Sequence, residues 1–560
     1  MAFDASKLKH LPKILPDQEL KIFNSLLAVF ILSIFGLLAG IFLKITIAAP
    51  QAGSSYTEGI IGRPRLINPL YSDNNTADRD LVKLTYAGLV KFDGEKIIPD
   101  LADKWEISPD QKSYTFFLKQ GITWPDGKPF DAQDVVFTIK AIQNPKYQSS
   151  LLASFNGIKI EALDQTAVKF TLSKPLTPFL ESLSVGILPK HIWENIPVEA
   201  ISLTDFNIQP LGLGPYKFKK LVKNKFGTIH SYFLERNENY HLGKPYIKTL
   251  AFRFYDTVDE SLEGLQRNEV EGISFLPQRL MTDFKPKSTN IHTFQLPQYT
   301  AVFFNTSASS HVADITIRKA LSLAVDKKKI LQEAIDGQGS LIDGPILPGF
   351  PGYNKDIEKF PFDPQQAGQI LDKANWILAD DNLRKNKNDE VLSLTLTTAN
   401  TPELTKAAQI IQKSWQDIGV QVELKIVDTA AIQGSIISPR KFDVLLFGEI
   451  VGLDPDPYPF WHSSQISTQG LNLSNFKNKG ADQVLEQARE TPDLNKKAEK
   501  YIHFQNILVA EIPAIFLYNP NYLYPISSKI KGLNQNLIIN PSDRFARVQK
   551  WYIKTKRVLK

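Results

Sequence analysis

Residues 391–427, VLSLTLTTANTPELTKAAQIIQKSWQDIGVQVELKIV, carry the pattern that decides the fold. Apolar and polar residues alternate over 392–396, which predicts a strand. Apolar positions then recur at three- and four-residue spacing as far as Ile418, which predicts a helix that Gly419 ends. A second alternation over 420–426 predicts another strand. This order favours a parallel sheet with right-handed crossovers.

The pattern continues downstream with a short helical stretch at 429–437 and a third apolar run at 442–447. Ligands of such sheets bind beyond the carboxyl ends of the strands, which marks the loop that starts at Gly448. The whole chain has 560 residues, 43% hydrophobic and 22% charged, enough for more than one globular unit. The fold class predicted is α/β.

The composition excludes several classes of protein. No cysteine occurs, so disulfides, thiol nucleophiles, cysteine zinc sites and a lipidated cysteine are ruled out. The formal net charge of +6 is concentrated in residues 541–560, which hold seven bases and one acid. We interpret this tail as a solvated, membrane-facing end, because no nucleic-acid-binding motif accompanies it.

A long apolar stretch near the start predicts a membrane anchor. No charged residue occurs at 22–43, and about 20 such residues cross a bilayer. Four lysines precede the stretch and only Lys44 follows closely, so residues 1–21 are expected in the cytoplasm, 22–48 in the membrane and 50–560 outside. A signal peptide cleaved near Ala48 or Ala49 is the alternative.

The motifs of familiar enzymes are missing. The eight histidines are scattered, and no Walker loop, dinucleotide fingerprint or nucleophile elbow occurs, so no cofactor is expected. Asp454 and Asp456 match the Asp-x-Asp of a metal-dependent glycosyltransferase, but they equally suit an ammonium group. The surrounding segment, 448–462, is acidic, aromatic and rich in proline, which favours a cationic or peptide-like ligand.

A dispersed set of motifs runs through the chain in order: LADKWE at 101–106, YTFFL at 114–118, GITWPDGKPF at 121–130, GLGPY at 212–216, IRKAL at 317–321 and DPDP at 454–457. From about Tyr56 to the end, the chain resembles the family 5 extracellular solute-binding proteins of ABC importers. This family includes oligopeptide, dipeptide and nickel binders.

The resemblance implies a two-lobe periplasmic-binding-protein-like fold of type II with an extra subdomain. We expect lobe I at 55–96, 206–297 and 518–560, the inserted subdomain at 97–205 and lobe II at 298–517. It also implies a monomer that closes by a hinge on a peptide and presents it to an ABC permease, without catalysis.

Peptide binders of this family usually hold the α-ammonium with an aspartate three residues before the Asp-Pro or Glu-Pro of this loop. Here that position, counted back from Asp456, is Leu453, so Glu449 or Asp454 is expected to supply the charge. The candidate ligand-binding residues are Asp73, Asn74, Glu449, Asp454, Asp456, Trp461 and Tyr518, the two aromatic residues being equally compatible with a core role. Trp124 and Arg318 are expected to be structural.

Several alternatives stay open. The ligand could be a nickel chelate, an oligosaccharide or another small solute in place of a peptide. The chain could also be a membrane-anchored glycosyltransferase, or a surface receptor or chaperone that serves no transporter.

Overall fold

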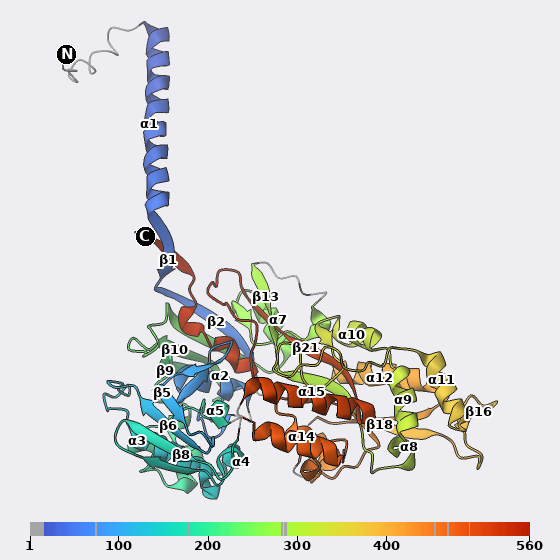
Figure 1. Cartoon of the computed structure of the whole chain (residues 1–560). Helices are drawn as coiled ribbons and strands as arrows, with labels where there is room; N and C mark the ends of the chain where they lie inside the picture. The colour runs from blue at the N-terminus through green and yellow to red at the C-terminus, as the bar shows by residue number, and fades with distance from the viewer. Residues whose placement is uncertain are drawn as a thin grey trace.

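The longest strand of the described residues, β21 (Ala514–Ser527), joins the two halves of the molecule. Its first part pairs with β14 (Gln298–Phe304) and its second part with β13 (Thr289–Gln295). Since β13 and β14 are consecutive in the chain, two strand segments cross together between two lobes (Figure 1). The structure is a computed structural model that describes residues 16–72, 75–176, 179–281, 284, 288–429, 431–452, 455–467, 470–491 and 493–559.

One mixed sheet extends through both lobes. Its twelve strands, counted over the described residues, follow the order β19-β18-β20-β14-β21-β12-β2-β11-β10-β9, with β13 and β15 paired to β21. The bounds of the remaining strands are β2 (Gly53–Ile61), β9 (Tyr216–Lys223), β10 (Ile229–Arg236), β11 (Ile247–Tyr255), β12 (Gly272–Ile273), β15 (Gly339–Leu341), β18 (Ser393–Ala399), β19 (Gln421–Val427) and β20 (Val444–Ile450).

The second lobe contains the elements predicted from residues 391–427. Strand β18 pairs in parallel with both β19 and β20, so the predicted parallel order is confirmed. Helix α12 (Pro402–Asp417) lies between β18 and β19, and Gly419 takes the left-handed φ of +86° that ends it. The other helices of this lobe are α8 (Ser310–Ala313), α9 (Ile315–Leu323), α10 (Lys327–Ile335), α11 (Pro364–Lys373), α13 (Tyr458–Trp461), α14 (Lys479–Arg489) and α15 (Leu494–Glu511), and a small hairpin joins β16 (Ile377–Leu378) to β17 (Arg384–Lys385).

The first lobe packs α2 (Thr76–Thr85) and the short helix η9 (Pro541–Phe545) on the sheet, with α7 (Val258–Gln266) between β11 and β12. A separate antiparallel sheet follows the order β5-β6-β8-β7, with bounds β5 (Ala102–Ile107), β6 (Ser113–Leu118), β7 (Lys159–Ala162) and β8 (Ala167–Thr171). Around it lie β3 (Val90–Phe92), β4 (Ile97–Pro99), α3 (Ala132–Gln143), α4 (Leu152–Phe155), α5 (Phe179–Ser182) and α6 (Lys190–Trp193). Asp131 caps α3 by accepting the backbone N–H of Gln133.

The motif residues Trp124 and Arg318 are structural. The indole Nε1 of Trp124 donates to Asp134 at 3.1 Å inside the core of the β5–β8 subdomain. The guanidinium of Arg318 donates to the carbonyl oxygens of residues 312, 313, 511 and 512. Trp124 therefore fixes its turn to the start of α3, whereas Arg318 ties α9 to residues 511 and 512, which are more than 190 positions away in the chain.

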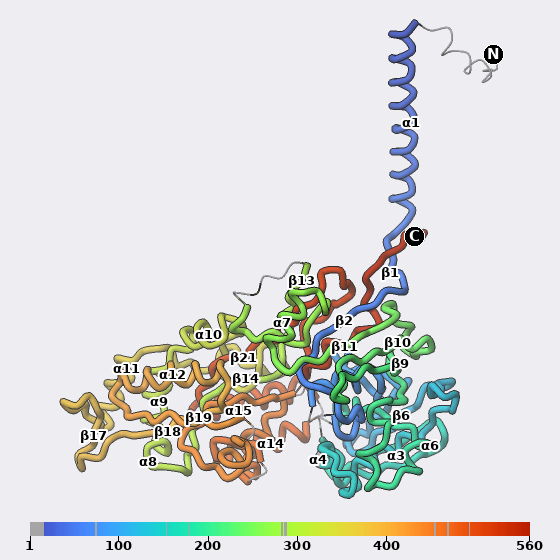
Figure 2. Tube along the Cα trace, turned by 180° about the vertical axis from the view of Figure 1, so that it is seen from behind, coloured from blue at the N-terminus to red at the C-terminus, as the bar shows by residue number. Residues whose placement is uncertain are grey.

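The apolar N-terminal stretch forms α1 (Asp17–Ile45), a 29-residue helix that contains an 18-residue stretch with a mean hydropathy of 2.8 and has no residue buried against the body. The helix ends at Ile45, inside the predicted membrane segment 22–48, and residues 46–51 form strand β1 (Thr46–Gln51). Strand β1 pairs with β22 (Lys554–Leu559), so the C-terminal end of the chain returns to the foot of α1 (Figure 2).

The interpretation of residues 541–560 as a solvated tail was wrong over its first half. Arg544 is completely buried and forms ion pairs with Glu58 and Asp80, which are equally buried. Arg547 pairs with Asp93. These bases lie inside the first lobe because buried carboxylates compensate their charge.

Candidate functional site

A cavity of about 680 Å³ lies where the two lobes face each other. The first lobe contributes α2, the α5 turn and the η9 segment, and the second lobe contributes the loop after β20. The volume is within the range of small-molecule and peptide-sized sites. The loop after β20, which the sequence marked as a ligand-binding loop, therefore borders the cavity.

The loop after β20 reaches across to the first lobe. Val451 donates its backbone N–H to the carbonyl of Pro297 at 2.7 Å, which fixes the loop at the strand crossing. Gly452 then adopts a left-handed φ of +73°, and a Cβ built there would lie 3.7 Å from the carboxylate of Glu181. The loop therefore lies close to the α5 turn of the first lobe on this side of the cavity.

Asp456 lines the cavity, but its charge is already compensated. Its Oδ2 accepts from Nε of Arg489 at 2.7 Å, and its Oδ1 accepts from the backbone N–H of Tyr458 at 3.1 Å. The Arg489 guanidinium also lies 3.7 Å from the centre of the Tyr458 ring, whose other neighbour is the stacked ring of His462. These contacts stiffen the loop. They also pair the Asp456 carboxylate with Arg489, whereas a metal-dependent glycosyltransferase would need that carboxylate to bind its metal ion.

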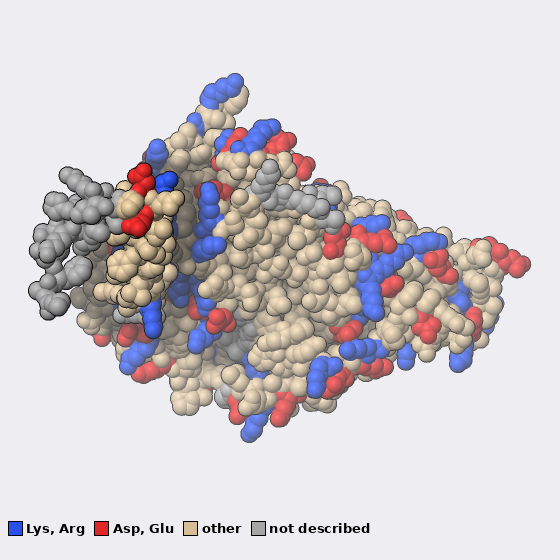
Figure 3. Space-filling view, turned by 90° about the horizontal axis from the view of Figure 1, so that it is seen from above, with Lys and Arg blue, Asp and Glu red and all other residues tan. Residues whose placement is uncertain are grey.

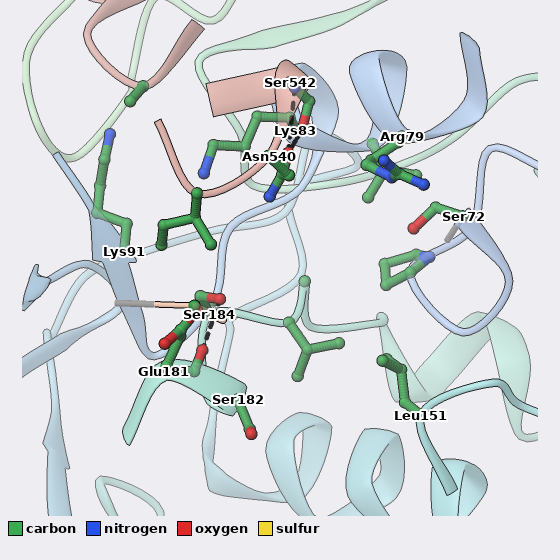
Figure 4. A pocket seen from close by; sticks show the side chains of 18 of the residues that line it. Ser72, Arg79, Lys83, Lys91, Leu151, Glu181, Ser182, Ser184, Asn540 and Ser542 are labelled. Carbon is green, nitrogen blue, oxygen red and sulfur yellow. Dashed lines mark hydrogen bonds between the residues drawn. The ribbon is translucent and has the colours of Figure 1, made fainter. Parts of the chain in front are cut away.

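Basic side chains line the first-lobe wall of the cavity. The nitrogen ends of Arg79, Lys83 and Lys91 lie along the upper side of the close view in Figure 4, and Glu181, Ser182 and Ser184 lie below them. Lys83 forms an ion pair with Asp543 at 2.6 Å. The cavity therefore presents cations on one wall and hydroxyl groups with one carboxylate on another.

Lys91 differs from its neighbours. Its side chain is 8% exposed, and its ammonium forms no hydrogen bond or ion pair with any described residue. Burial lowers the pKa of Lys91 to about 8, against the opposing attraction of Asp100. The nearby Asp100 carboxylate instead bonds to Nε2 of His241 at 2.6 Å. A buried cation without a partner is costly unless an anionic group joins it.

The predicted acidic residues are found in different environments. The Glu449 side chain is buried and is not among the side chains that line the cavity. Its Oε2 accepts a hydrogen bond from the Tyr299 hydroxyl at 2.5 Å, and burial raises the pKa of Glu449 to about 8. Asp454, Asp73 and Asn74 lie outside the described residues, while their chain neighbours Gly452 and Ser72 line the cavity.

The two predicted aromatic residues pack in the second lobe. Trp461 is 1% exposed among the rings of Phe303, Phe476 and Phe516. Tyr518 is 2% exposed and belongs to the core beneath α12. Both side chains match the core interpretation that was open for them, and neither borders the cavity.

Sequence reasoning missed the basic wall. Arg79 and Lys83 are four residues apart and so share one face of α2, a spacing that is visible in the sequence. Lys91 interrupts the apolar run GLVKF at 88–92, which is an unusual place for a charged side chain. Within the described residues, no group of three or more His, Asp or Glu side chains is arranged to hold a metal ion.

Comparisons with known proteins give a consistent result. The model of the bacterial extracellular solute-binding proteins, family 5 (middle region), matches residues 96–472. The chain is 28% identical over 513 residues to the oligopeptide-binding protein AppA of Bacillus subtilis (strain 168), covering 90% of this chain and 92% of that protein. It is 27% identical over 514 residues to the dipeptide-binding protein of Escherichia coli (strain K12), covering 87% and 93%.

Solved structures resemble the fold over the same range. AppA from Bacillus subtilis, in complex with a nonapeptide, superposes with a TM-score of 0.72 at 28% identity, covering 90% of this chain and 100% of that one. NikZ from Campylobacter jejuni, in complex with Ni(L-His), also gives 0.72 at 28% identity, covering 89% and 99%. CtaP from Listeria monocytogenes gives 0.77 at 27% identity, covering 90% and 100%.

Proposed function

Because the chain belongs to the bacterial extracellular solute-binding proteins of family 5, we propose that it captures peptides between its two lobes and delivers them to an ABC permease. The observation that carries the proposal is the cavity of about 680 Å³ between the lobes, which takes residues from both. A ligand that touches both lobes stabilises their closed arrangement by its differential affinity for that state.

The names of the relatives support peptides as the class of ligand. The protein from Bacillus subtilis is named an oligopeptide-binding protein and that from Escherichia coli a dipeptide-binding protein, and both align over most of their length. The family consists of solute-binding proteins, and we propose that this chain likewise binds its ligand without catalysis.

The charges around the cavity suit a molecule with charges of both signs. The unpartnered ammonium of Lys91, next to the basic side chains of Lys83 and Arg79, favours a carboxylate of the ligand. For the α-ammonium we propose Asp454, because Glu449 bonds to Tyr299 and is away from the cavity. A peptide carries both groups.

We propose the limits of the lobes as 55–96, 206–297 and 518–560 for lobe I, 97–205 for its inserted subdomain and 298–517 for lobe II. The separate sheet of β5 to β8 lies within 97–205, the proposed inserted subdomain. The chain passes between the lobes twice, once between β13 and β14 and once in the middle of β21. We propose that these two places form the hinge.

We also propose that α1 is an uncleaved anchor with its N-terminus in the cytoplasm. Its length and apolar composition suit a bilayer, and none of its residues packs on the body. Cleavage near Ala48 or Ala49 would cut strand β1, which pairs with β22 over six residues. The intact mass of the membrane-extracted protein, compared with the mass of the full 560-residue chain, tests this part.

Native mass spectrometry of the full chain tests the ligand class. The protein would be measured in detergent as purified, and again after mild unfolding and refolding to remove bound ligand. We expect heterogeneous adducts of peptide mass that disappear on refolding and return with a peptide pool. A clean mass that no peptide pool shifts would contradict peptide capture.

A pair of tryptophan substitutions ties the adducts to the cavity. Ser184 is exposed, lines the cavity and donates its hydroxyl to the carbonyl of Glu181 at 2.7 Å. Ser435 is equally exposed, lies outside the cavity lining and donates to the carbonyl of Ala431 at 2.8 Å. Ser184→Trp is expected to remove the adducts, whereas Ser435→Trp keeps them.

A further inference from the structure

The two ends of the chain meet at the foot of helix α1. Strand β1 continues directly from α1, and it pairs with β22 in an antiparallel register from Thr46 opposite Leu559 to Gln51 opposite Lys554. We call residues 46–51 and 554–559 the juxtamembrane clasp. It forms a sheet of its own and lies between α1 and the body in Figures 1 and 2.

One side chain fastens the clasp to the helix. The guanidinium Nη1 of Arg557 donates to Oγ1 of Thr46 at 3.1 Å, and the group lies 6.0 Å from the centre of the Phe42 ring. Thr46 itself donates its hydroxyl to the carbonyl of Phe42 at 2.5 Å. The last turn of α1 and strand β22 therefore form one connected unit.

The clasp is basic and partly apolar. Lys44 at the end of α1 and Lys554, Lys556 and Arg557 on β22 are exposed, and no acidic residue occurs at 44–51 or 552–559. Leu559 is 74% exposed and Ile47 49%. Figure 3 shows this face from above, with both blue Lys or Arg and red Asp or Glu side chains around the end-on helix.

We propose that the juxtamembrane clasp is a docking site for anionic phospholipid head groups on the outer surface of the membrane. The proposal rests on the membrane anchor of the proposed function. Because α1 ends at Ile45, the clasp is the first structure after the proposed anchor, which would place its bases at head-group depth. Exposed apolar side chains beside clustered bases are the composition of surfaces that bind anionic bilayers.

Docking of the clasp gives the binding domain a defined orientation. The elements that border the cavity, α2, α5 and the β20 loop, belong to the body below the clasp, and α4 and α14 lie at the end remote from α1 (Figure 1). A docked clasp holds the hinge side of the body toward the bilayer. Solutes then reach the cavity without crossing the head groups.

The test uses the full chain in nanodiscs of phosphatidylcholine, with and without phosphatidylglycerol. The chain contains no cysteine, so Thr555→Cys provides a single labelling site between Lys554 and Lys556. A fluorophore at this site reports contact with head groups through quenching by lipids that carry a spin label on the head group. We expect strong quenching only in discs that contain phosphatidylglycerol, and less quenching at high salt.

Matched charge variants identify the groups responsible. Lys554→Gln, Lys556→Gln and Arg557→Gln together are expected to shift the contact equilibrium by about 100-fold, since each base contributes about fivefold at an anionic surface. The control removes three exposed lysines from the remote end of the second lobe, Lys373→Gln, Lys387→Gln and Lys425→Gln. The control is expected to leave the quenching unchanged.

The outcomes separate the lipid site from the function it rests on. Equal quenching in both kinds of disc, or none in either, overturns the anionic-lipid site while the anchor and peptide binding stand. Failure of the chain to enter discs at all overturns the anchor and with it the lipid site. Peptide adducts measured on the same preparation report separately on the binding function.

Discussion

The side-chain amide of Asn519 donates a hydrogen bond to the carbonyl oxygen of Leu296 at 2.8 Å. The same amide donates to the carbonyl of Gln298 at 2.5 Å. Asn519 lies in β21 where this strand leaves β14 for β13, and residues 296 and 297 connect β13 to β14, which begins at Gln298. One side chain therefore ties together the two segments that pass between the lobes.

Replacing Asn519 by alanine tests this connection. Asn519 is only 7% exposed, and its substitution leaves the carbonyl groups of Leu296 and Gln298 without this donor, so the free energy of unfolding is expected to fall by about 1–3 kcal/mol. Small-angle scattering of the ligand-free protein is expected to report a wider range of lobe separations. Asn388→Ala, at an exposed position, is the matched control and is expected to change stability by less than about 0.5 kcal/mol. Equal behaviour of the two variants would show that the amide does not couple the crossing segments.

The local elements could be predicted from the sequence, and the contacts between distant segments could not. The alternation at 392–396 and the spacing up to Ile418 correctly predicted β18 and α12, because both periods depend on neighbours in the chain. The partner of Glu449 is Tyr299, 150 residues away, and no local pattern announces it. Glu449 lies in the segment that was expected to bind the ligand and was therefore predicted as a ligand-binding residue. In the structure its carboxylate accepts a hydrogen bond from Tyr299 of the same lobe.

The burial of the basic residues near the C-terminus also depends on contacts between distant segments, so the sequence did not predict it. The sequence has an excess of positive charge at 541–560. Arg544 is nevertheless buried, and it is paired with Glu58 of β2 and Asp80 of α2, which are more than 460 residues earlier in the chain. Among the described residues of this stretch, Lys550 and the bases on β22 are exposed, and the pairing of β22 with β1 depends on the whole first lobe bringing the two ends together. Charge counts describe composition, whereas burial depends on the tertiary fold.

Lys91→Met tests the proposed carboxylate site in the cavity. The buried ammonium has no partner among the described residues, so its loss is expected to raise the free energy of unfolding of the ligand-free protein by about 1–3 kcal/mol at neutral pH. The same variant is expected to bind a carboxylate-bearing peptide at least about tenfold more weakly. Denaturant unfolding and calorimetric titration measure the two quantities.

The matched control for Lys91 is Lys387→Met, an exposed position remote from the cavity, for which neither quantity is expected to change. Because burial holds the pKa of Lys91 at about 8, the wild-type affinity for a carboxylate ligand is expected to fall as pH rises through this value. Unchanged peptide affinity in Lys91→Met would remove this side chain from the site.

Glu449→Gln tests a pH-dependent contribution to stability. Burial raises the folded-state pKa of this carboxyl from 4.5 to about 8. Between these values the folded protein keeps a proton that the unfolded chain has released, so this contribution to stability is full below the lower value and is lost as pH rises toward 8. The variant, whose amide oxygen still accepts from Tyr299, is expected to be more stable than the wild type by about 3–5 kcal/mol at the upper end. At about pH 4 the difference is expected to vanish.

The same variant separates two roles for this residue. Since Glu449 is not among the residues lining the cavity, Glu449→Gln is expected to leave peptide affinity unchanged, whereas Asp454→Asn is expected to lower it. A loss of about tenfold or more in Glu449→Gln would instead support its originally predicted role as the ammonium partner.

Arg544→Met tests the buried ion cluster of the first lobe. Its guanidinium donates to Glu58 at 2.9 and 2.8 Å and to Asp80 at 2.8 Å, and all three side chains have no exposed surface. Removing the cation leaves two buried carboxylates uncompensated, so the free energy of unfolding is expected to fall by about 3–5 kcal/mol. Burial raises the pKa of Glu58 already in the wild type, so the loss is expected to be smaller in acid, where the carboxyl is protonated.

The combination Glu58→Gln, Asp80→Asn and Arg544→Met distinguishes charge from shape in this cluster. It removes all three charges with similar volumes, and it is expected to recover most of the stability lost in Arg544→Met at neutral pH. Denaturant unfolding of the single and triple variants measures the recovery. If the triple variant is as unstable as Arg544→Met, the hydrogen-bond geometry between β2, α2 and η9, and not the balance of charge, is what holds these elements together.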